Sequence, residues 1–483
     1  MDPQNNNANA STTPISPGFK RVLSLWDLIF YGIVLVQPIG AIGVFGIASK
    51  GSGGHMATTL LIAMVAMMLT ALSYGRMASL YPAAGSAYTY VGKGLNPHLG
   101  FLAGWAMFLD YLIVPVINTV YGSLTLQRLF PGTPYFMWVL IFVFVITLLN
   151  LRGIRTTARS NEILLAIMVV VIGFFIVLAV RFIFQNQGWE GLFSGNPFYN
   201  PSTFDLKSVM TATSLAALTY IGFDGVTTLA EDVRNARRNM MLAPVLVCLV
   251  TGLFGVVQIY LAQQVWPGFD TFPDLETAFY DVCRKVGGSF LFNAVAAILF
   301  IACLGSGLAG QVAAARLLFA MGRDGIIPGK MFAFLSKKNA TPVYNIIFLG
   351  IITVVVSMLL SYQNAAELLN FGAFLAFMGV NIAAIRQFWF LRSGAGKNNL
   401  IVDLLIPSAG LVFCFFIWIS LPSPAKITGG MWFLAGILYL AIKTGGFRHK
   451  PVTFDFKAAE STDDKPNNKP GTMNFLHQNV PEI

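Results

Sequence analysis

The stretch from Leu218 to Gly225 places polar and conformationally free residues inside a segment that is otherwise apolar. It reads Leu-Thr-Tyr-Ile-Gly-Phe-Asp-Gly, so a carboxylate lies between two glycines. A charged group is costly at membrane depth, and glycines loosen a helix whose released backbone groups must then bond another partner. The segment therefore predicts a binding site for a ligand or an ion. Its candidate residues are Thr219, Tyr220, Ile221, Gly222, Phe223 and Asp224.

A second interruption lies five apolar segments earlier. The run from 25 to 49 is broken by Gln37-Pro-Ile-Gly-Ala-Ile-Gly43, as the run from 207 to 232 is broken around Gly222. Paired broken helices in corresponding positions indicate an inverted repeat with a binding site near the membrane midplane. The alternative is two ordinary helices in which glycine permits close packing. The first break adds the candidates Gln37, Ile39, Gly40 and Ala41.

The composition requires these segments to lie in a membrane. Hydrophobic residues make up 56% of the chain, charged residues only 11%, and 41 of the 483 residues are Phe, which excludes a water-soluble domain. Runs of about 20 apolar residues, enough to cross about 30 Å of hydrocarbon, predict an all-α polytopic protein with twelve transmembrane helices. Their centres fall near residues 37, 66, 112, 143, 172, 220, 252, 305, 352, 378, 411 and 435.

The ends of the chain and its charges give an orientation. Residues 1–20 and 446–483 are rich in Asn, Ser, Thr, Pro and Asp, and we expect both tails to be disordered around a transmembrane domain at 21–445. Clusters of Lys and Arg, such as those at 152–159 and 234–238, place both termini in the cytoplasm by the positive-inside rule. Topology thus explains the net charge of +10, and nucleic acid is not an expected partner.

The predicted outer loop from Gln264 to Gly287 is acidic instead. It contains Asp270, Asp274, Glu276 and Asp281, which would attract cations approaching from outside. The alternative is an ordinary solvated loop. The four cysteines and four histidines show no metal-ligand spacing, so we expect no metal and no cofactor. Without a metal cluster or nucleophile triad an enzyme is not expected.

Four motifs carry a family resemblance. In chain order they are Tyr81-Pro-Ala-Ala-Gly-Ser-Ala-Tyr-Thr-Tyr90, Asn96-Pro-His-Leu-Gly-Phe-Leu-Ala-Gly-Trp105, Gly222-Phe-Asp-Gly-Val-Thr-Thr-Leu-Ala-Glu-Asp232 and Arg316-Leu-Leu-Phe-Ala-Met-Gly-Arg-Asp324. From about Lys20 to Lys450 the chain resembles the amino acid-polyamine-organocation permeases. Within that superfamily, Leu109-Asp-Tyr-Leu112 with Pro115 and Asn118 looks most like the bacterial putrescine importers.

The resemblance implies a leucine-transporter-type fold and a function. It implies five-plus-five inverted repeats, at about 21–185 and 205–392, with helices 1 and 6 broken and two further helices at about 400–445. It implies a monomer or homodimer in the bacterial inner membrane that imports a small organic amine, such as putrescine, by alternating access. We expect this import to be coupled to protons. An amino acid permease, as symporter or exchanger, is the alternative, and a non-transporting amine receptor a more distant one.

The first break bears on the choice between these substrates. The resemblance implies that backbone N–H groups at this break hold an amino acid carboxylate, with help from the half-helix dipole. Here Pro38 removes one donor, while Gly40, Ala41 and Ile42 keep theirs. The proline favours an amine over an amino acid without excluding the latter.

An amine needs carboxylates and aromatic faces, which contribute a cation–π attraction of about 0.5–2 kcal/mol. We expect Asp110, beside Tyr111, or Asp224 to pair with the ammonium, and Tyr220 and Phe223 to form an aromatic wall. Two alternatives stay open. Asp224 can instead cap the broken helix or bond a neighbouring helix, and Asp110 can pair with an internal Arg or with an Asn such as Asn118.

Energy coupling is the last open point. The resemblance implies a position in the fifth helix where proton-coupled carriers of the family can have Lys, and Met168 occupies it here. Because Met cannot carry a proton, coupling would use Asp110, Asp224, Glu231 or the substrate's own ionisation. Glu231 is also a gate candidate at the cytoplasmic helix end. Sodium stays possible with Ser306 as a ligand, although Ser beside Gly in a helix commonly serves packing.

Overall fold

The computed structural model describes residues 23–81, 86–152, 158–229, 233–323, 329–336, 341–391 and 399–449. These residues form helices and connecting turns, with one isolated parallel bridge between Leu23 and Val233. The predicted all-α class is confirmed. The predicted N-terminal tail, residues 450–483 of the C-terminal tail and Glu231 lie outside the described residues.

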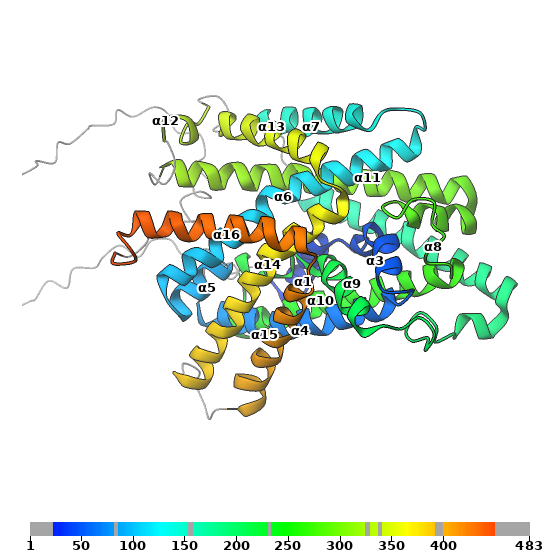
Figure 1. Cartoon of the computed structure of the whole chain (residues 1–483), viewed down its shortest axis with the longest axis horizontal. Coiled ribbons are helices and arrows are strands. Elements are labelled where there is room, and N and C mark those ends of the chain that lie inside the picture. Colours follow the sequence, from blue (N-terminus) through cyan, green and yellow to red (C-terminus); the bar gives the residue numbers. More distant parts are fainter. Residues whose placement is uncertain are drawn as a thin grey trace, which may run out of the picture.

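Figure 1 shows the helices in chain order. They are α1 (Leu25–Val36), α2 (Gly40–Gly43), α3 (Phe45–Gly51), α4 (Met56–Leu80), α5 (Ser86–Gly94), α6 (Pro97–Leu129), α7 (Tyr135–Leu151), α8 (Ala158–Leu192), α9 (Leu206–Ala216), η1 (Ala217–Tyr220), η2 (Phe223–Leu229), α10 (Ala236–Val265), α11 (Ala278–Arg323), α12 (Gly329–Phe332), α13 (Val343–Leu359), α14 (Tyr362–Ala384), η3 (Ile385–Phe390), η4 (Leu400–Leu405), α15 (Ile406–Ile419) and α16 (Ser423–Lys443). The elements η1 and η2 are 3₁₀-helices, whereas η3 and η4 are π-helical.

Ten helical segments of the described chain are long and apolar enough to cross a bilayer. Two further apolar helices, α7 and α13, have 17 residues each. At 1.5 Å per residue each extends about 26 Å, at the lower limit for a hydrocarbon core about 30 Å thick. Each of the twelve predicted centres lies in a different one of these twelve segments. The number of helices that actually cross the membrane stays a prediction.

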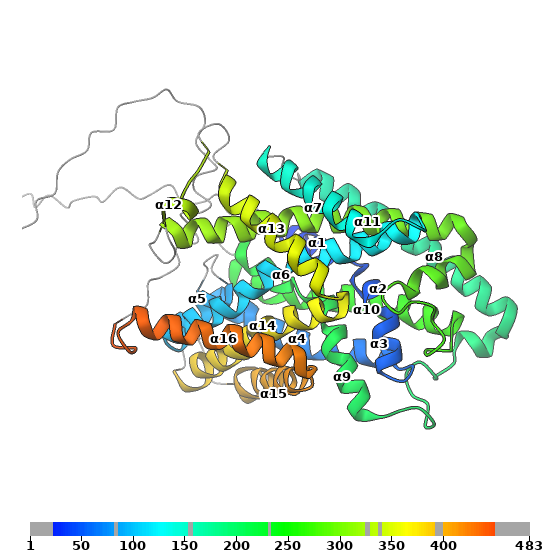
Figure 2. The same cartoon turned by 45° about the horizontal axis from the view of Figure 1, so that its top comes forward.

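The outer surface has the apolar character that lipid requires. One stripe of α8 exposes apolar side chains at helical spacing, namely Ile163, Ile167, Val170, Phe174 and Val177. An exposed apolar stripe of this length is unfavourable in water and favourable against acyl chains. With the long apolar helices, it identifies an integral membrane protein. Figure 2 shows α8 at one end of the molecule and α16 along its side.

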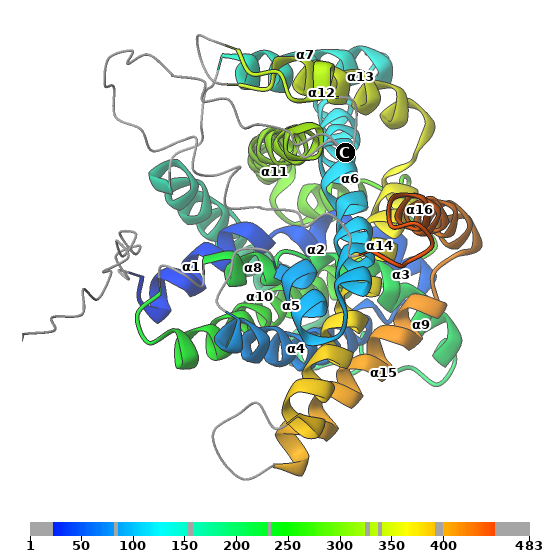
Figure 3. The same cartoon turned by 90° about the vertical axis from the view of Figure 1, so that its left-hand side faces the viewer.

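The middle of the molecule contains the two broken elements. Figure 3 shows α1 and α2 running through the centre, with α7 and α13 along one edge and α15 toward the opposite one. Glycines let the surrounding helices approach closely. A Cβ on Gly75 of α4 would lie 2.5 Å from the carbonyl oxygen of Met240 in α10, and one on Gly372 of α14 would lie 2.4 Å from that of Ala106 in α6. Only glycine permits such contacts.

Both predicted breaks are present. Between α1 and α2 the chain leaves the helix at Gln37, which has a φ of 60°, and between η1 and η2 it does so at Gly222, which has a φ of 117°. The released carbonyls find partners. Gln37 O accepts from the Gly40 N–H at 3.0 Å, and Pro38 O accepts from Gln258 Nε2 at 3.0 Å.

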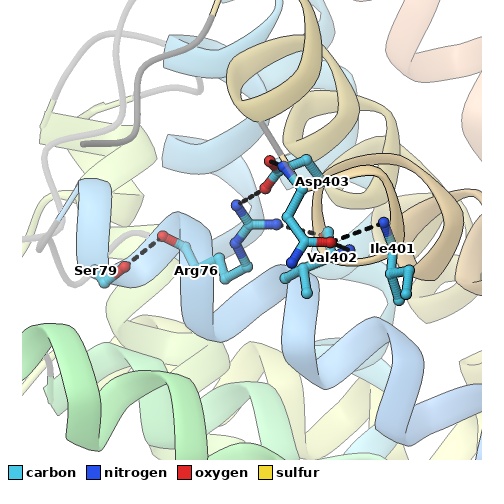
Figure 4. A network of polar contacts seen from close by, with 6 residues as sticks. Arg76, Ser79, Ile401, Val402 and Asp403 are labelled. Atoms are coloured by element: carbon cyan, nitrogen blue, oxygen red, sulfur yellow. Dashed lines mark hydrogen bonds and ion pairs between the residues drawn. The ribbon is translucent and has the colours of Figure 1, made fainter. Parts of the chain in front are cut away.

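A partly buried ion pair connects α4 to the segment that begins at η4 (Figure 4). The Arg76 guanidinium pairs with the Asp403 carboxylate and donates to Val402 O at 2.5 Å. The same guanidinium lies 3.8 Å above the ring of Phe388 in η3. The other Asp403 oxygen accepts from the Asn399 N–H at 2.7 Å. One arginine therefore holds three elements together.

Candidate functional site

A cavity of about 570 Å³ lies beside the two breaks, between α1, α2, α6, α11 and α14. It brings together nine of the residues that the sequence nominated. They are Gln37, Ile39, Gly40, Asp110, Tyr111, Ile221, Gly222, Asp224 and Ser306. Because they come from segments far apart in the chain, this convergence makes the cavity the candidate site.

Four other nominated residues do not line this cavity. Ala41 and Thr219 are buried in the packing around it. The Tyr220 hydroxyl donates to Leu60 O at 2.9 Å, toward α4. The Phe223 ring lies 5.5 Å from that of Tyr74 and faces away with it. The structure therefore places the expected aromatic wall in the helix packing, since the break presents its glycine side to the cavity.

Other aromatic residues line the cavity instead of Tyr220 and Phe223. The cavity is lined by Tyr31, Tyr111, Tyr121 and Tyr362, of which the sequence analysis named only Tyr111. The rings of Tyr121 and Tyr362 lie 4.9 Å apart. Tyr121 follows Asp110 by three helical turns, so helical periodicity from Asp110 was a usable signal for it. Tyr362 begins a distant helix, and nothing local in the sequence links it to the site.

The two ends of the cavity differ in exposure. Tyr121 and Tyr362 are 3% and 7% exposed, whereas Tyr31 and Leu35 are 39% and 40% exposed. The cavity is therefore open at the end that carries Tyr31 and Leu35, in the second half of α1.

Arg316 of α11 also lines the cavity.

Tyrosines and a loop close the buried end. Tyr280 and Thr125 share a hydrogen bond of 2.6 Å between their hydroxyls, and the Tyr280 ring lies 6.4 Å from that of Tyr121. Glu276 accepts from the Tyr362 N–H at 2.9 Å. Burial raises the pKa of the Glu276 carboxyl, and the backbone N–H groups of Gln363 and Tyr362 oppose that rise. The loop between α10 and α11, which contains Glu276, is thus joined to the start of α14.

Three carboxylates of the acidic segment, Asp274, Glu276 and Asp281, have partners in the structure. Asp274 accepts from the Glu276 N–H and the Thr277 hydroxyl, both at 2.9 Å, ahead of α11. Asp281 forms an ion pair with Arg128 of α6. Three of the four carboxylates therefore have local partners, and Asp270 is exposed.

Asp110 has the most unusual environment in the cavity. Its Oδ1 is buried and has no hydrogen-bond partner among the described residues. Asn118, the predicted alternative partner, instead donates to Val114 O at 2.8 Å and to the Ser306 hydroxyl at 3.0 Å. A buried carboxylate oxygen without a donor is unstable unless a cation, a proton or a ligand satisfies it. Asp110 therefore has the chemistry of a site for a cationic group.

Asp224 combines two positions. It is the second residue of the 3₁₀-helix η2 and is 8% exposed, and the backbone N–H groups of Gly222 and Gly225 lie around its carboxylate. A carboxylate in this first turn interacts favourably with the dipole of the second half of the broken helix. Asp224 also lines the cavity, close enough to Asp110 for the two charges to interact. Together they form an acidic region suited to an organic cation.

Comparison with known proteins identifies the family. Residues 31–434 match the family model described as amino acid permease. The chain belongs to the amino acid permease family. This permease is 33% identical over 436 residues to the low-affinity putrescine importer PlaP of Escherichia coli K12, an alignment that covers 89% of this chain and 95% of PlaP. The expected superfamily and the resemblance to putrescine importers are thereby confirmed.

Two other relatives cover the permease almost as fully. The methylthioribose transporter of Bacillus subtilis is 27% identical over 452 residues, covering 88% of this chain and 93% of the relative. The branched-chain amino acid permease BcaP of Lactococcus lactis is 26% identical over 459 residues, covering 88% and 94%. All three relatives are named for transport, although their named substrates differ in charge and shape.

Proposed function

We propose that this permease imports a small organic amine, such as putrescine or a related polyamine or monoamine, by alternating access. The observation that carries the proposal is the buried Oδ1 of Asp110, which has no hydrogen-bond partner within the described part of the chain, in a cavity that Asp224 also lines. An ammonium group supplies both the positive charge and the N–H donors that this oxygen lacks. The 33% identity with a putrescine importer supports the same choice.

The aromatic part of the site consists of Tyr111, Tyr121 and Tyr362. Their rings line the cavity that contains Asp110, and ring faces attract a desolvated ammonium by about 2 kcal/mol. Pro38 supports an amine in a second way, because it removes one N–H from the break and its carbonyl is held by Gln258. The break between α1 and α2 is therefore less suited to binding a carboxylate than a glycine-rich break would be.

The transport cycle rests on the two broken helices. We infer twelve crossings arranged as five-plus-five inverted repeats, at about 21–185 and 205–392, followed by two helices at about 400–445. Cytoplasmic termini, supported by the distribution of Lys and Arg, place the Tyr31 end of the cavity on the inside of a bacterial inner membrane. The described conformation then corresponds to an inward-facing state, closed outside by Tyr121 and Tyr362.

Proton coupling is part of the proposal. Met168 is buried and cannot carry a proton, so Asp110 is our first candidate, with Asp224 and Glu231 as further ones. Ser306 is less suited to sodium because its hydroxyl already accepts from Asn118. A facilitator or exchanger needs no such group and is the alternative.

An amino acid permease is the second candidate function. The relative BcaP, named as a branched-chain amino acid permease, favours it. The Gly40 and Ile42 N–H groups donate to Gln37 O and Ile39 O, both at 3.0 Å, so a carboxylate would have to replace these hydrogen bonds. In that case the substrate's ammonium would still use Asp110, and its carboxylate the break. A non-transporting amine receptor is a more distant candidate.

A binding panel and a flux assay distinguish these functions. We expect diamines and monoamines to raise the thermal midpoint of the detergent-purified protein, and Asp110→Asn to remove the shift. Stabilisation by amino acids alone would overturn the amine proposal. Counterflow of a labelled amine into proteoliposomes then separates a transporter from a receptor, since a receptor binds the amine without exchanging it.

A further inference from the structure

A stack of aromatic side chains joins α16 to α6. Trp105 Nε1 of α6 donates to Trp432 O of α16 at 3.0 Å, and Trp432 Nε1 donates to Trp105 O at 3.1 Å. The two indole rings are stacked, with their centroids 5.1 Å apart. The Tyr439 ring of α16 extends the stack, since it lies 5.8 Å from the ring of Trp105 and 5.9 Å from that of Phe101. We call these four side chains the aromatic clamp.

The aromatic clamp holds the face of α6 that points away from the cavity of about 570 Å³, the main cavity. At 3.6 residues per turn, Phe101 lies about 40° from Trp105 around the helix, whereas Asp110 lies about 140° away. Seven residues of α6 line the main cavity, namely Met107, Asp110, Tyr111, Val114, Ile117, Asn118 and Tyr121. By the same count all seven fall within about 60° of the direction opposite Trp105. The helix α16 therefore supports α6 from behind the candidate site.

Pro115 makes the clamped part of α6 depend on its neighbours. It lies inside α6 and has no N–H to continue the helical hydrogen bonds, so the two parts of the helix are coupled less firmly there. The part after Pro115 is held to α11, because Asn118 Nδ2 donates to the Ser306 hydroxyl at 3.0 Å. The part before it carries both Trp105 and Asp110 and packs against α5, α14 and α16. The position of Asp110 is therefore set by these contacts.

Side-chain packing connects the aromatic clamp to the wall of the main cavity. The Phe108 ring lies 6.2 Å from that of Trp105 and 5.8 Å from that of Trp432. Phe108 belongs to a buried apolar cluster against which Tyr111 and Leu317 also pack, and these two residues line the main cavity. A displacement of Trp105 is therefore passed on to the site through direct contacts.

We propose that the aromatic clamp positions Asp110: through it, α16 sets the rotation of α6 and the position of its first part along the helix axis. The inference rests on the proposed amine site and adds Trp105 and Trp432 to the residues that determine its affinity. A carboxylate turned toward the helix packing would no longer meet the ammonium. The helix α16 thus contributes to substrate binding although none of its residues lines the main cavity.

Gly436 of α16 offers a way to disturb the aromatic clamp without touching the site. A Cβ on Gly436 would lie 2.4 Å from Trp105 Cδ1 and 2.6 Å from Trp105 Nε1, the nitrogen that donates to Trp432 O. Gly436→Ala therefore displaces the Trp105 ring, whereas it favours the helix itself, since alanine is the better helix former. Gly430 of the same helix is a matched control, because a Cβ there meets nothing within 4 Å.

The test is a double-mutant cycle in which the binding of putrescine is measured in detergent. We expect Gly436→Ala to weaken binding by about tenfold and Gly430→Ala by less than about twofold. In the Asp110→Asn background Gly436→Ala should change the affinity by less than about twofold, because the carboxylate that the clamp positions is absent. Equal losses in the two backgrounds, or wild-type affinity in Gly436→Ala, would overturn the proposal.

Trp432 provides a graded second test that also replaces Gly436→Ala if that variant does not fold. Trp432→Phe keeps a ring in the stack and removes one hydrogen bond, whereas Trp432→Leu removes the ring as well. We expect Trp432→Phe to lose less putrescine affinity than Trp432→Leu, and the loss in Trp432→Leu to disappear in the Asp110→Asn background. Size exclusion shows which variants are folded. A folded Trp432→Leu variant with wild-type affinity would contradict the proposal.

A second ligand separates this inference from the amine proposal. If wild type binds leucine but not putrescine, the amine function fails, and the same cycle is measured with leucine, whose ammonium would use Asp110. The aromatic clamp is then supported if Gly436→Ala weakens leucine binding only while Asp110 is present. It is overturned if the loss is the same in the Asp110→Asn background.

Discussion

The α-carbon of Gly222 lies directly against the backbone of Leu35. A Cβ on Gly222 would come within 3.4 Å of both the carbonyl carbon and the carbonyl oxygen of Leu35. Gly222 also has a φ of 117°, which L-residues rarely adopt. The two broken helices therefore come into contact at a glycine whose backbone conformation would strain any side chain, and both residues line the main cavity.

We predict that Gly222→Val stops transport while the protein still folds. The strained conformation would cost about 1–3 kcal/mol, enough to straighten or displace the break but less than the stability of a helical bundle. Uptake into proteoliposomes and elution on size exclusion measure the two effects. Gly173→Val serves as the control, because a Cβ on Gly173 meets nothing within 4 Å and Gly173 does not line the main cavity. Wild-type uptake by Gly222→Val would show that the break does not need this conformation.

Asp110→Asn should weaken amine binding by about 10- to 100-fold, because an ammonium–carboxylate hydrogen bond contributes about 1.5–3 kcal/mol. Asp224→Asn should weaken it less, since backbone N–H groups already surround that carboxylate. It should still affect an amine more than an amino acid. Isothermal titration of both variants with one amine and one amino acid gives the comparison. Unchanged amine affinity in Asp110→Asn would remove Asp110 from the site.

The same Asp110→Asn variant tests coupling. A high substrate concentration compensates for the weaker binding of the variant, so its residual uptake can be measured. If Asp110 carries the proton, this residual uptake should no longer depend on an imposed pH gradient. Proteoliposomes with and without the gradient provide the measurement. A surviving pH dependence would assign the proton to another group, such as Asp224 or the substrate itself.

The sequence predicted the elements better than the directions of their side chains. Gly222, Asp224 and the Gln37–Gly43 interruption were recognisable because a glycine or a charge in an apolar run has few structural uses. Tyr220 and Phe223, in the same segment, were expected in the site and lie in the packing against α4. An irregular segment has no fixed period, so spacing along it does not predict which side a residue faces.

Long-range partners were beyond a single sequence for another reason. Tyr362 reaches the site because Glu276 holds the start of α14, 86 residues away in the chain. Asn118 turned out to bond Ser306 across 188 residues, which left Asp110 without the partner expected for it. Such pairings depend on helix packing, which neither hydropathy nor composition encodes.

The ion pair of Arg76 with Asp403 should contribute strongly to stability. Their side chains are 14% and 12% exposed, so removing one partner leaves a nearly buried charge, at a cost of about 3–5 kcal/mol. We expect Arg76→Met and Asp403→Leu each to lower the thermal midpoint in detergent, and the double variant to recover much of the loss. Additive losses would mean that the two charges act independently.

Stability should also depend on pH through His55, outside the membrane spans. His55 is 1% exposed and its Nε2 lies 3.0 Å from the Thr203 hydroxyl, and burial lowers its pKa below the ordinary 6.5. The unfolded chain therefore binds the proton first, so this contribution is complete above pH 6.5 and is lost as pH falls below it. Thermal midpoints between pH 8 and 5 should fall less steeply in His55→Gln than in wild type. The exposed His449→Gln is the control, and an equal slope in all three proteins would contradict the assignment.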